Sequence, residues 1–273
     1  MLRMQSETGW WLIRHPDHAR LAGAFADQWG NDRFRKPEPR ARVLHGISCH
    51  DDGWAARDAH PSITRKGLPS AFSAELVGKY SAFEEIDLED YLAVRDRAVR
   101  IIAGDDPYAG LLIAMHTFNL LSEHADRSTI APAGLQVLDS FLTNLSIYMD
   151  ELRARITADM TLCNDAKSPQ TVLEHFRLLQ ACDNLSLLAC VNYAKPAHLL
   201  HPLPLNDGST SEVQVESAGP RTFRLAPWPF AEHGLSFSIK ARHVAGHLFE
   251  SSAQLEDAFH AAHEELLEVR LVG

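Results

Sequence analysis

Residues 9–30 read GWWLIRHPDHARLAGAFADQWG, and this stretch indicates how the fold begins. Its first residues, 9–14, are aromatic and β-branched as in a strand, and Pro16 then permits a helix to start, because an N–H in the first turn needs no helical partner. Apolar residues recur at helical spacing after His18, at Leu21, Ala22, Phe25 and Trp29. This spacing places His18 on the face of the helix that is turned toward the core.

Helical periodicity continues through the middle of the chain. Val43, Leu44 and Ile47 mark a second helix that carries His50 and Asp51 near its C-terminal end. Further helices with Gly or Pro at their ends are expected at residues 87–103, 107–123, 134–157 and 169–193.

The pattern changes after Pro202. The segments SEVQVES, RTFRL and LSFSIKAR are strand-like. Residues 251–269 place their apolar side chains on one helical face, which predicts a final helix.

These patterns predict a mainly α protein with a small antiparallel sheet. The C-terminal region would form the sheet, with the N-terminal strand as an optional partner. We expect one domain over residues 1–273: a helical bundle in 1–200 and a β-containing extension in 201–273 that ends in a helix. The PWPF segment with Trp228 is an alternative candidate to border a pocket.

Composition limits the possible functions. A net charge of −10 opposes nucleic-acid binding, and the short basic stretch at residues 33–42 is interpreted as a solvated loop. No apolar stretch is long enough to span a bilayer and residues 1–7 lack the features of a secretory signal, so we expect a cytoplasmic protein without membrane contact. The four cysteines form no C-x-x-C pair, which argues against a thiolate zinc site and a disulfide framework.

The stretch HDDGW, residues 50–54, contains the first candidate metal ligands. Adjacent residues on a helix lie about 100° apart around its axis, so His50 and Asp51 can reach one ion. The pair alone is weak support, because a polar helix end of this kind can simply be solvated.

Three further candidates lie on the apolar faces of other expected helices: His18, His116 and Asp183. A buried carboxylate costs several kcal/mol unless a charge or a donor compensates, so Asp183 needs a partner. Together the five residues offer imidazoles and carboxylates, which suit Mn²⁺, Fe²⁺ or Zn²⁺. His45 is an alternative first ligand, but the aromatic neighbours of His18 favour burial of His18.

The order His, His-Asp, His, Asp on successive helices resembles the HD-domain superfamily of metal-dependent phosphohydrolases and their oxygenase relatives. The chain also resembles a family of bacterial proteins of unknown function within that superfamily. The segments that carry this likeness are WWLIRHPDHARLAGAFADQWG, HDDGWAARDAHP, DPYAGLLIAMHT, LLQACDNLSLLAC and LAPWPF. The resemblance implies an HD-domain-like bundle.

The resemblance also implies site roles. His18 would be the first-helix histidine, His50 and Asp51 the doublet, Asp183 the late aspartate, and His116 the additional histidine of the two-metal members. The chain departs from the pattern in two places. A further histidine is expected, for which His124 and His175 are the candidates, and Trp54 replaces the lysine that often follows HD-x-G. These departures put the second ion and the phosphodiesterase mechanism in doubt.

We therefore expect a metal-dependent hydrolase of a small phosphorylated substrate, with one or two ions. Asp51 is the candidate to direct the proton, and Asp58 and Lys66, in the loop after the doublet, are candidates for catalysis or substrate contact. A turn aspartate and a surface lysine are the alternative interpretation of Asp58 and Lys66. Two other functions remain: a di-iron oxygenase, and a non-catalytic metal-binding sensor or scaffold. The oligomeric state is left open.

Overall fold

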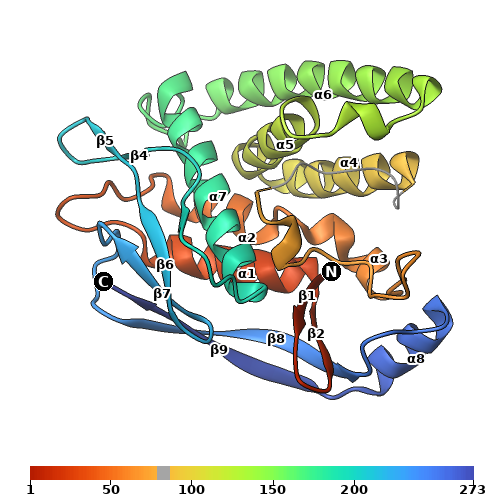
Figure 1. The fold of residues 1–273 in the computed structure, drawn as a ribbon. Coiled ribbons are helices and arrows are strands. Elements are labelled where there is room, and N and C mark those ends of the chain that lie inside the picture. Colours follow the sequence, from red (N-terminus) through yellow and green to blue (C-terminus); the bar gives the residue numbers. More distant parts are fainter. Residues whose placement is uncertain (79–86) are drawn as a thin grey trace.

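The computed structural model describes residues 1–78 and 87–273. Its helices are α1 His15–Gln28, α2 Arg40–Cys49, α3 Ala55–Asp58, α4 Leu88–Asp105, α5 Pro107–Ser122, α6 Pro132–Ala158, α7 Pro169–Cys190 and α8 Ser252–Ala261. Its strands are β1 Leu2–Gln5, β2 Gly9–Ile13, β3 Ala197–His198, β4 Leu203–Pro204, β5 Thr210–Ser211, β6 Gln214–Gly219, β7 Thr222–Ala226, β8 Leu235–Ala245 and β9 Glu264–Val272. Figure 1 shows the helices α1 to α7 above a curled sheet, with α1 and α7 next to the sheet and α8 at the end of the sheet.

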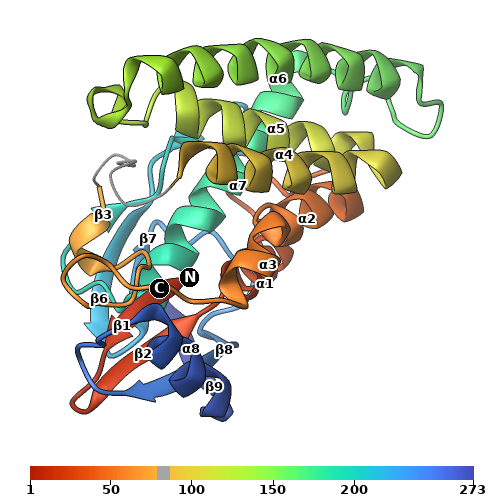
Figure 2. The same ribbon diagram turned by 90° about the vertical axis from the view of Figure 1, so that its right-hand side faces the viewer.

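The four helices expected in the middle of the chain form α4 to α7, within three residues at each end. Local chemistry explains where they begin. Pro occupies the first turn of α5, α6 and α7, where its missing N–H is harmless. The side chain of Asp106 caps α5, and that of Ser168 caps α7. In Figures 1 and 2, α4 and α5 lie between α6 and the lower helices.

The prediction of a mainly α bundle with a small antiparallel sheet is wrong. The chain is about 49% helical and 20% strand, and the sheet curls into a half-barrel. Within the described residues seven strands join in the order β1-β2-β8-β9-β7-β6-β3, and the sheet is mixed because β7 and β9 run parallel. The N-terminal hairpin is part of this sheet, with Trp10 of β2 opposite Val244 of β8.

The helix predicted at residues 251–269 is wrong in its second half. α8 ends at Ala261, and β9 occupies Glu264–Val272. Alternate β9 residues, Leu267, Val269 and Leu271, are buried, whereas Leu266 is 68% exposed. The segment therefore follows the period of two that a strand requires.

The LAPWPF segment supports α1 at the end opposite to His18. Pro229 O accepts from Gly30 N at 2.9 Å, and Trp228 O accepts from Asn31 Nδ2 at 2.9 Å. Phe230 packs edge-on against Trp29, with ring centroids 5.5 Å apart. Eleven residues of helical rise put this contact about 16 Å from His18. The PWPF segment therefore contacts the end of α1 that lies away from the expected ligands.

The half-barrel supports α1 along its length. Phe25 on α1 and Phe237 on β8 meet edge to face, with ring centroids 4.9 Å apart, within the main hydrophobic core. α8 covers the far end of β2 and β8 through a second cluster that includes Trp10, Val244 and Phe259. In the part of the chain described here, no helix is both long and apolar enough to cross a membrane.

Candidate metal centre

Five buried side chains meet where α1, α2, α5 and α7 pack together. His18 comes from α1, His50 and Asp51 from the end of α2, His116 from α5 and Asp183 from α7. The exposed fraction of each of these residues is 8% or less. The structure thus brings all five ligand candidates expected from the sequence into one place.

Two glycines allow the backbones around the cluster to approach closely. A Cβ on Gly23 of α1 would lie 1.9 Å from the Oγ atom of Ser48, so only glycine lets α1 and α2 meet here. A Cβ on Gly53 would lie 2.3 Å from the carbonyl oxygen of Val94, so the glycine of HDDGW lets the turn press against α4. The sequence thereby places Asp51 next to α4 as well as next to α1.

The contacts of His18 leave two acceptors facing each other. The Ser186 hydroxyl donates to the backbone oxygen of Asp183 at 2.8 Å, so its oxygen accepts from His18 Nδ1 at 2.9 Å. With the proton on Nδ1, the Nε2 atom of His18 carries a lone pair. This lone pair lies 3.0 Å from Asp51 Oδ2. Two acceptors at this distance require a proton or a cation between them.

His50 repeats this arrangement. Its Nδ1 atom donates to the carbonyl oxygen of Ile47 at 2.7 Å, which leaves a lone pair on Nε2. Nε2 is buried, lies 3.2 Å from Asp183 Oδ1, and has no partner of good hydrogen-bond geometry among the described residues. Asp183 Oδ2 lies 3.8 Å from His116 Nε2. A backbone bond that fixes one ring nitrogen while the other faces a carboxylate is a common arrangement in metal-binding histidines.

The potential ligand atoms form two overlapping groups. Those of His18, His50 and Asp51 lie within 4.8 Å of one another, and so do those of His50, His116 and Asp183. These buried groups could hold a metal ion. Their imidazole and carboxylate donors are those that Zn²⁺, Mn²⁺ and Fe²⁺ accept.

Burial and neighbouring charges shift the pKa values of the cluster residues in different directions. Burial opposes a charge on His50, but the carboxylates of Asp51 and Asp183 raise the pKa of His50 to about 9. Burial lowers the pKa of His116 to about 3. Burial opposes ionisation of Asp51, but Arg95 and His50 hold the pKa of this carboxyl well below its usual range. A metal ion would therefore compete with a proton on His50.

Arg95 on α4 is a site residue that the sequence reasoning missed. Its Nη1 atom donates to Asp51 Oδ1 at 2.6 Å, and its Nε atom donates to Tyr91 Oη at 3.2 Å. The guanidinium lies 5.4 Å from the ring centroid of Trp54 and 5.3 Å from that of Tyr91. A signal was present: Arg95 lies one helical turn from both Tyr91 and Val99, on the buried face of α4.

The structure gives Asp58 and Lys66 different places. Asp58 is buried beside the start of α1, where Oδ2 accepts from His15 N at 2.5 Å and Oδ1 accepts from the Met1 α-amino group at 2.8 Å. Burial opposes ionisation of Asp58, but His15 and the α-amino group hold its pKa well below the usual range. Asp58 thus supports α1 one turn before His18. Lys66 is exposed, in a loop tied to the sheet side of the molecule by a bond from Phe249 N to Gly67 O.

The other candidate histidines lie outside the cluster. His45 Nδ1 lies 3.3 Å from Asp106 Oδ2 at a half-buried position, so His18 occupies the place for which His45 was the alternative. The buried ring of His175 has Nδ1 2.7 Å from Tyr108 Oη. Neither His175 nor His124 belongs to a potential metal-binding group of the described residues.

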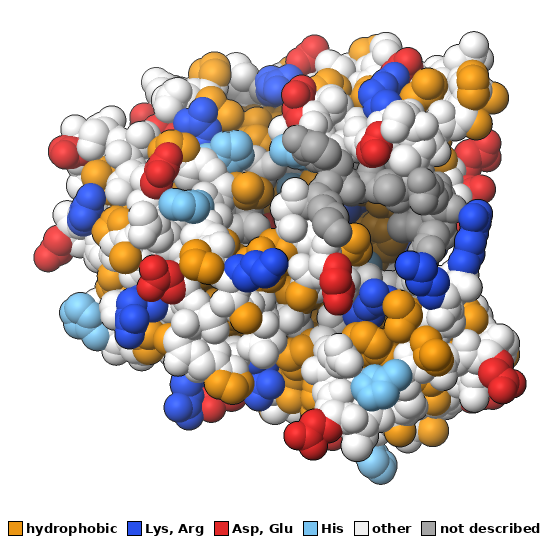
Figure 3. Space-filling view, in the orientation of Figure 1, with side chains coloured by type: hydrophobic (Ala, Val, Ile, Leu, Met, Phe, Trp, Pro, Cys, Tyr) orange, Lys and Arg blue, Asp and Glu red, His pale blue; other side chains and the backbone are white. Residues whose placement is uncertain are grey.

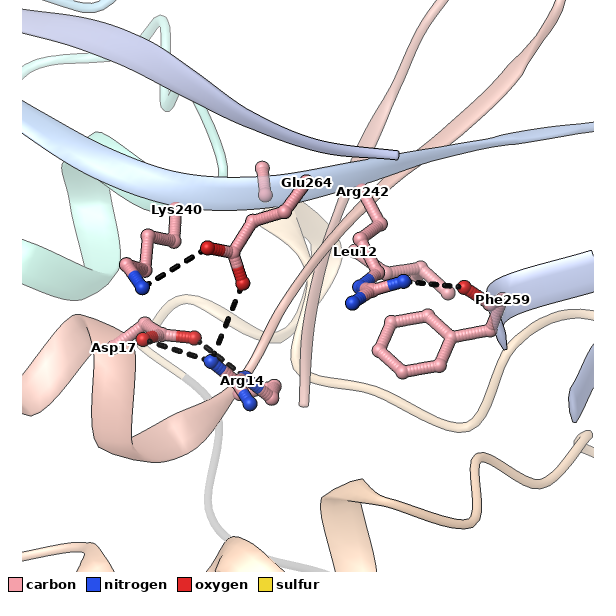
Figure 4. A pocket seen from close by; sticks show the side chains of 8 residues that line it. Leu12, Arg14, Asp17, Lys240, Arg242, Phe259 and Glu264 are labelled. Carbon is pink, nitrogen blue, oxygen red and sulfur yellow. Dashed lines mark hydrogen bonds and ion pairs between the residues drawn. The ribbon is translucent and has the colours of Figure 1, made fainter. Parts of the chain in front are cut away.

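A small pocket beneath the sheet has charged walls whose side chains are engaged in ion pairs and hydrogen bonds (Figure 4). Arg14 pairs with Asp17 at 2.7 Å and with Glu264 at 3.6 Å, and Lys240 pairs with Glu264 at 2.9 Å. Arg242 donates to Phe259 O and Ala262 O at the end of α8. The charged groups of this pocket thus link the start of α1 to β9, and β8 to both β9 and the end of α8.

Comparison with known proteins gives one finding. A family model described as "Protein of unknown function (DUF3891)" matches residues 1–246, a range that contains all five cluster residues and Arg95. No curated protein and no solved structure matches the chain.

Proposed function

The chain belongs to the DUF3891 family, since the match covers most of its length, and we propose that its His and Asp cluster is the metal centre of a hydrolase. The proposed substrate is a small phosphoric ester or anhydride. The net charge of −10 favours a small metabolite over a polynucleotide.

One observation carries this proposal. His18 Nε2 faces Asp51 Oδ2 at 3.0 Å and His50 Nε2 faces Asp183 Oδ1 at 3.2 Å, while the second nitrogen of each ring is already engaged. Burial of two such acceptor pairs is costly unless a cation lies between them. A divalent cation would satisfy both pairs without protonation of either histidine.

A bound divalent ion would lower the pKa of a water molecule and polarise a phosphoryl oxygen. The chain's own residues provide the rest. Ile47 O and Ser186 Oγ fix the tautomers of His50 and His18, so that their Nε2 atoms face the carboxylates. Arg95 donates to Asp51 Oδ1, so Asp51 Oδ2 is the oxygen that can bind the metal ion or accept a proton.

The proposal also places this family in the HD-domain superfamily, and the cluster residues support that placement. The ligand candidates follow the order His, His-Asp, His, Asp on α1, α2, α5 and α7. Among the residues that the structure describes, neither His124 nor His175 joins the cluster as the further histidine of the two-metal members. We therefore expect one tightly held ion, with any second ion bound more weakly near His116.

Elemental analysis of protein purified without a chelator or a metal-binding tag tests the centre. We expect close to one equivalent of Mn, Fe or Zn in the wild type, and loss of most of it in His50→Ala and Asp183→Ala. His175→Ala is the matched control, because it removes a buried histidine of α7 outside the cluster. The loaded wild type should release phosphate from at least one compound in a panel of phosphomonoesters, nucleotides and pyrophosphate.

The same analysis decides between the alternatives. Two irons per chain without phosphate release would favour a di-iron oxygenase. Stoichiometric metal with no turnover of any phosphorylated compound would favour a sensor or scaffold. A wild type that takes up no Mn²⁺, Fe²⁺ or Zn²⁺ when offered each ion would refute the metal centre.

A further inference from the structure

Arg95 brings a permanent positive charge to the cluster. Asp51, Asp183 and Arg95 together have a net charge of −1 when the three histidines are neutral. A divalent ion would change this net charge to +1. Because Arg95 is only 7% exposed and Asp51 only 5%, solvent compensates little of the excess. The loaded centre would therefore favour an anionic ligand.

Ring contacts and hydrogen bonds hold the guanidinium of Arg95 in place, but they do not engage all of its N–H donors. The rings of Trp54 and Tyr91 pack around it, Nε donates to Tyr91 Oη, and Nη1 donates to Asp51 Oδ1. Among the residues that the structure describes, none accepts a hydrogen bond from Nη2. An arginine fixed by aromatic rings with donors to spare can bind an oxyanion at little entropic cost.

The surface is hollowed on this side of the molecule. Figure 3, which has the orientation of Figure 1, shows a hollow to the right of the centre, with hydrophobic and basic side chains along part of its border. Arg95 belongs to α4 and Trp54 directly precedes α3. Arg95 and Asp51 are in direct contact, so a small ligand bound to one of them would lie close to the other.

We propose that Arg95 is a substrate-binding residue that donates to a phosphoryl oxygen at the metal centre. The inference rests on the proposed function, because the excess positive charge arises only when an ion is bound. To the proposed hydrolase function, the inference adds that Arg95 selects substrates with a phosphoryl group. Arg95 would contact the substrate directly, in addition to its contact with Asp51.

The test uses the full chain loaded with Mn²⁺, with inorganic phosphate and acetate as probes in separate calorimetric titrations. We expect the wild type to bind phosphate more tightly than acetate. Arg95→Gln should keep its Mn²⁺ but bind phosphate about ten- to hundredfold more weakly, the effect of a lost charge-assisted hydrogen bond. Arg100→Gln is the control, because Arg100 lies on the same helix and pairs with Asp96 at the surface.

Arg95→Lys provides a second variant that keeps the charge without the planar fork, and we expect about fivefold weaker phosphate binding. Phosphate affinities within twofold of the wild type in both loaded variants would overturn the inference. Loss of Mn²⁺ from both variants would also overturn it, since Arg95 would then only position Asp51. Tighter binding of acetate than of phosphate would exclude the phosphoryl assignment. Failure of the wild type to bind Mn²⁺, Fe²⁺ or Zn²⁺ would be the distinct failure of the proposed function.

Discussion

The strongest quantitative prediction concerns the stability of the metal-free protein as pH rises. In the folded chain the pKa of His50 is raised from 6.5 to about 9. A raised folded-state pKa means that protonation stabilises the native state fully below pH 6.5, and that this stabilisation is lost as pH rises to 9. At about 1.36 kcal/mol per pKa unit, the loss is about 3 kcal/mol. His50→Gln should remove this pH dependence, because its side chain cannot take up the proton.

Urea unfolding of chelator-treated protein, followed by tryptophan fluorescence between pH 6 and 9.5, measures the effect. The free energy of unfolding of the wild type should fall by about 3 kcal/mol more than that of His50→Gln over this window. His45→Gln, at a half-buried position outside the cluster, should behave as the wild type. Metal-loaded wild type should lose the dependence, since the ion replaces the proton. Parallel pH curves for the metal-free wild type and His50→Gln would refute the reasoning.

Three further predictions concern packing and charge. Gly53→Ala should lower the free energy of unfolding by about 1–3 kcal/mol, because its Cβ would lie 2.3 Å from a backbone oxygen of α4. Gly104→Ala should raise the free energy of unfolding by about 0.5–1 kcal/mol, because a Cβ at this position meets open space. Thermal unfolding of the two variants compares these effects. Asp58→Asn should cost about 1–3 kcal/mol at pH 7, and because the folded-state pKa of Asp58 is depressed, urea titrations should show this cost shrinking below pH 3.8. Val269→Asp should destabilise the chain by several kcal/mol while Leu266→Asp is nearly neutral, since Val269 is buried in β9 and Leu266 is exposed; equal losses would contradict a strand there.

Much of the candidate site was predictable because burial of polar residues is readable from helical periodicity. His18, His116 and Asp183 each lie among apolar residues at spacings of three and four, and all three are buried in the structure. Arg95 has the same signal, but a long arginine on an apolar face is usually taken to extend its charge to solvent. Its partner Asp51 lies 44 residues away, so only the three-dimensional fold reveals the pair.

The sheet was harder to predict for two physical reasons. β1 is only four residues long and half polar, so it gives little signal of its own. Residues 264–272 contain apolar side chains that fit both a helical face and an alternating strand, and only pairing with β8 and β7 selects the strand. Long-range pairing decides such segments, and sequence periodicity carries no information about it.

The pairing of β2 with β8 has a consequence for how this protein folds in the cell. Trp10 leaves the ribosome about 234 residues before its partner Val244, which at roughly 5–20 residues per second is a delay of about 12–47 s. Until β8 has been made, the edge of the β1–β2 hairpin that contains Trp10 and Trp11 has no partner strand. Chaperones that shield nascent chains would therefore be expected to engage the first dozen residues, and the helix with His18 would gain its final support only after β8 has been made.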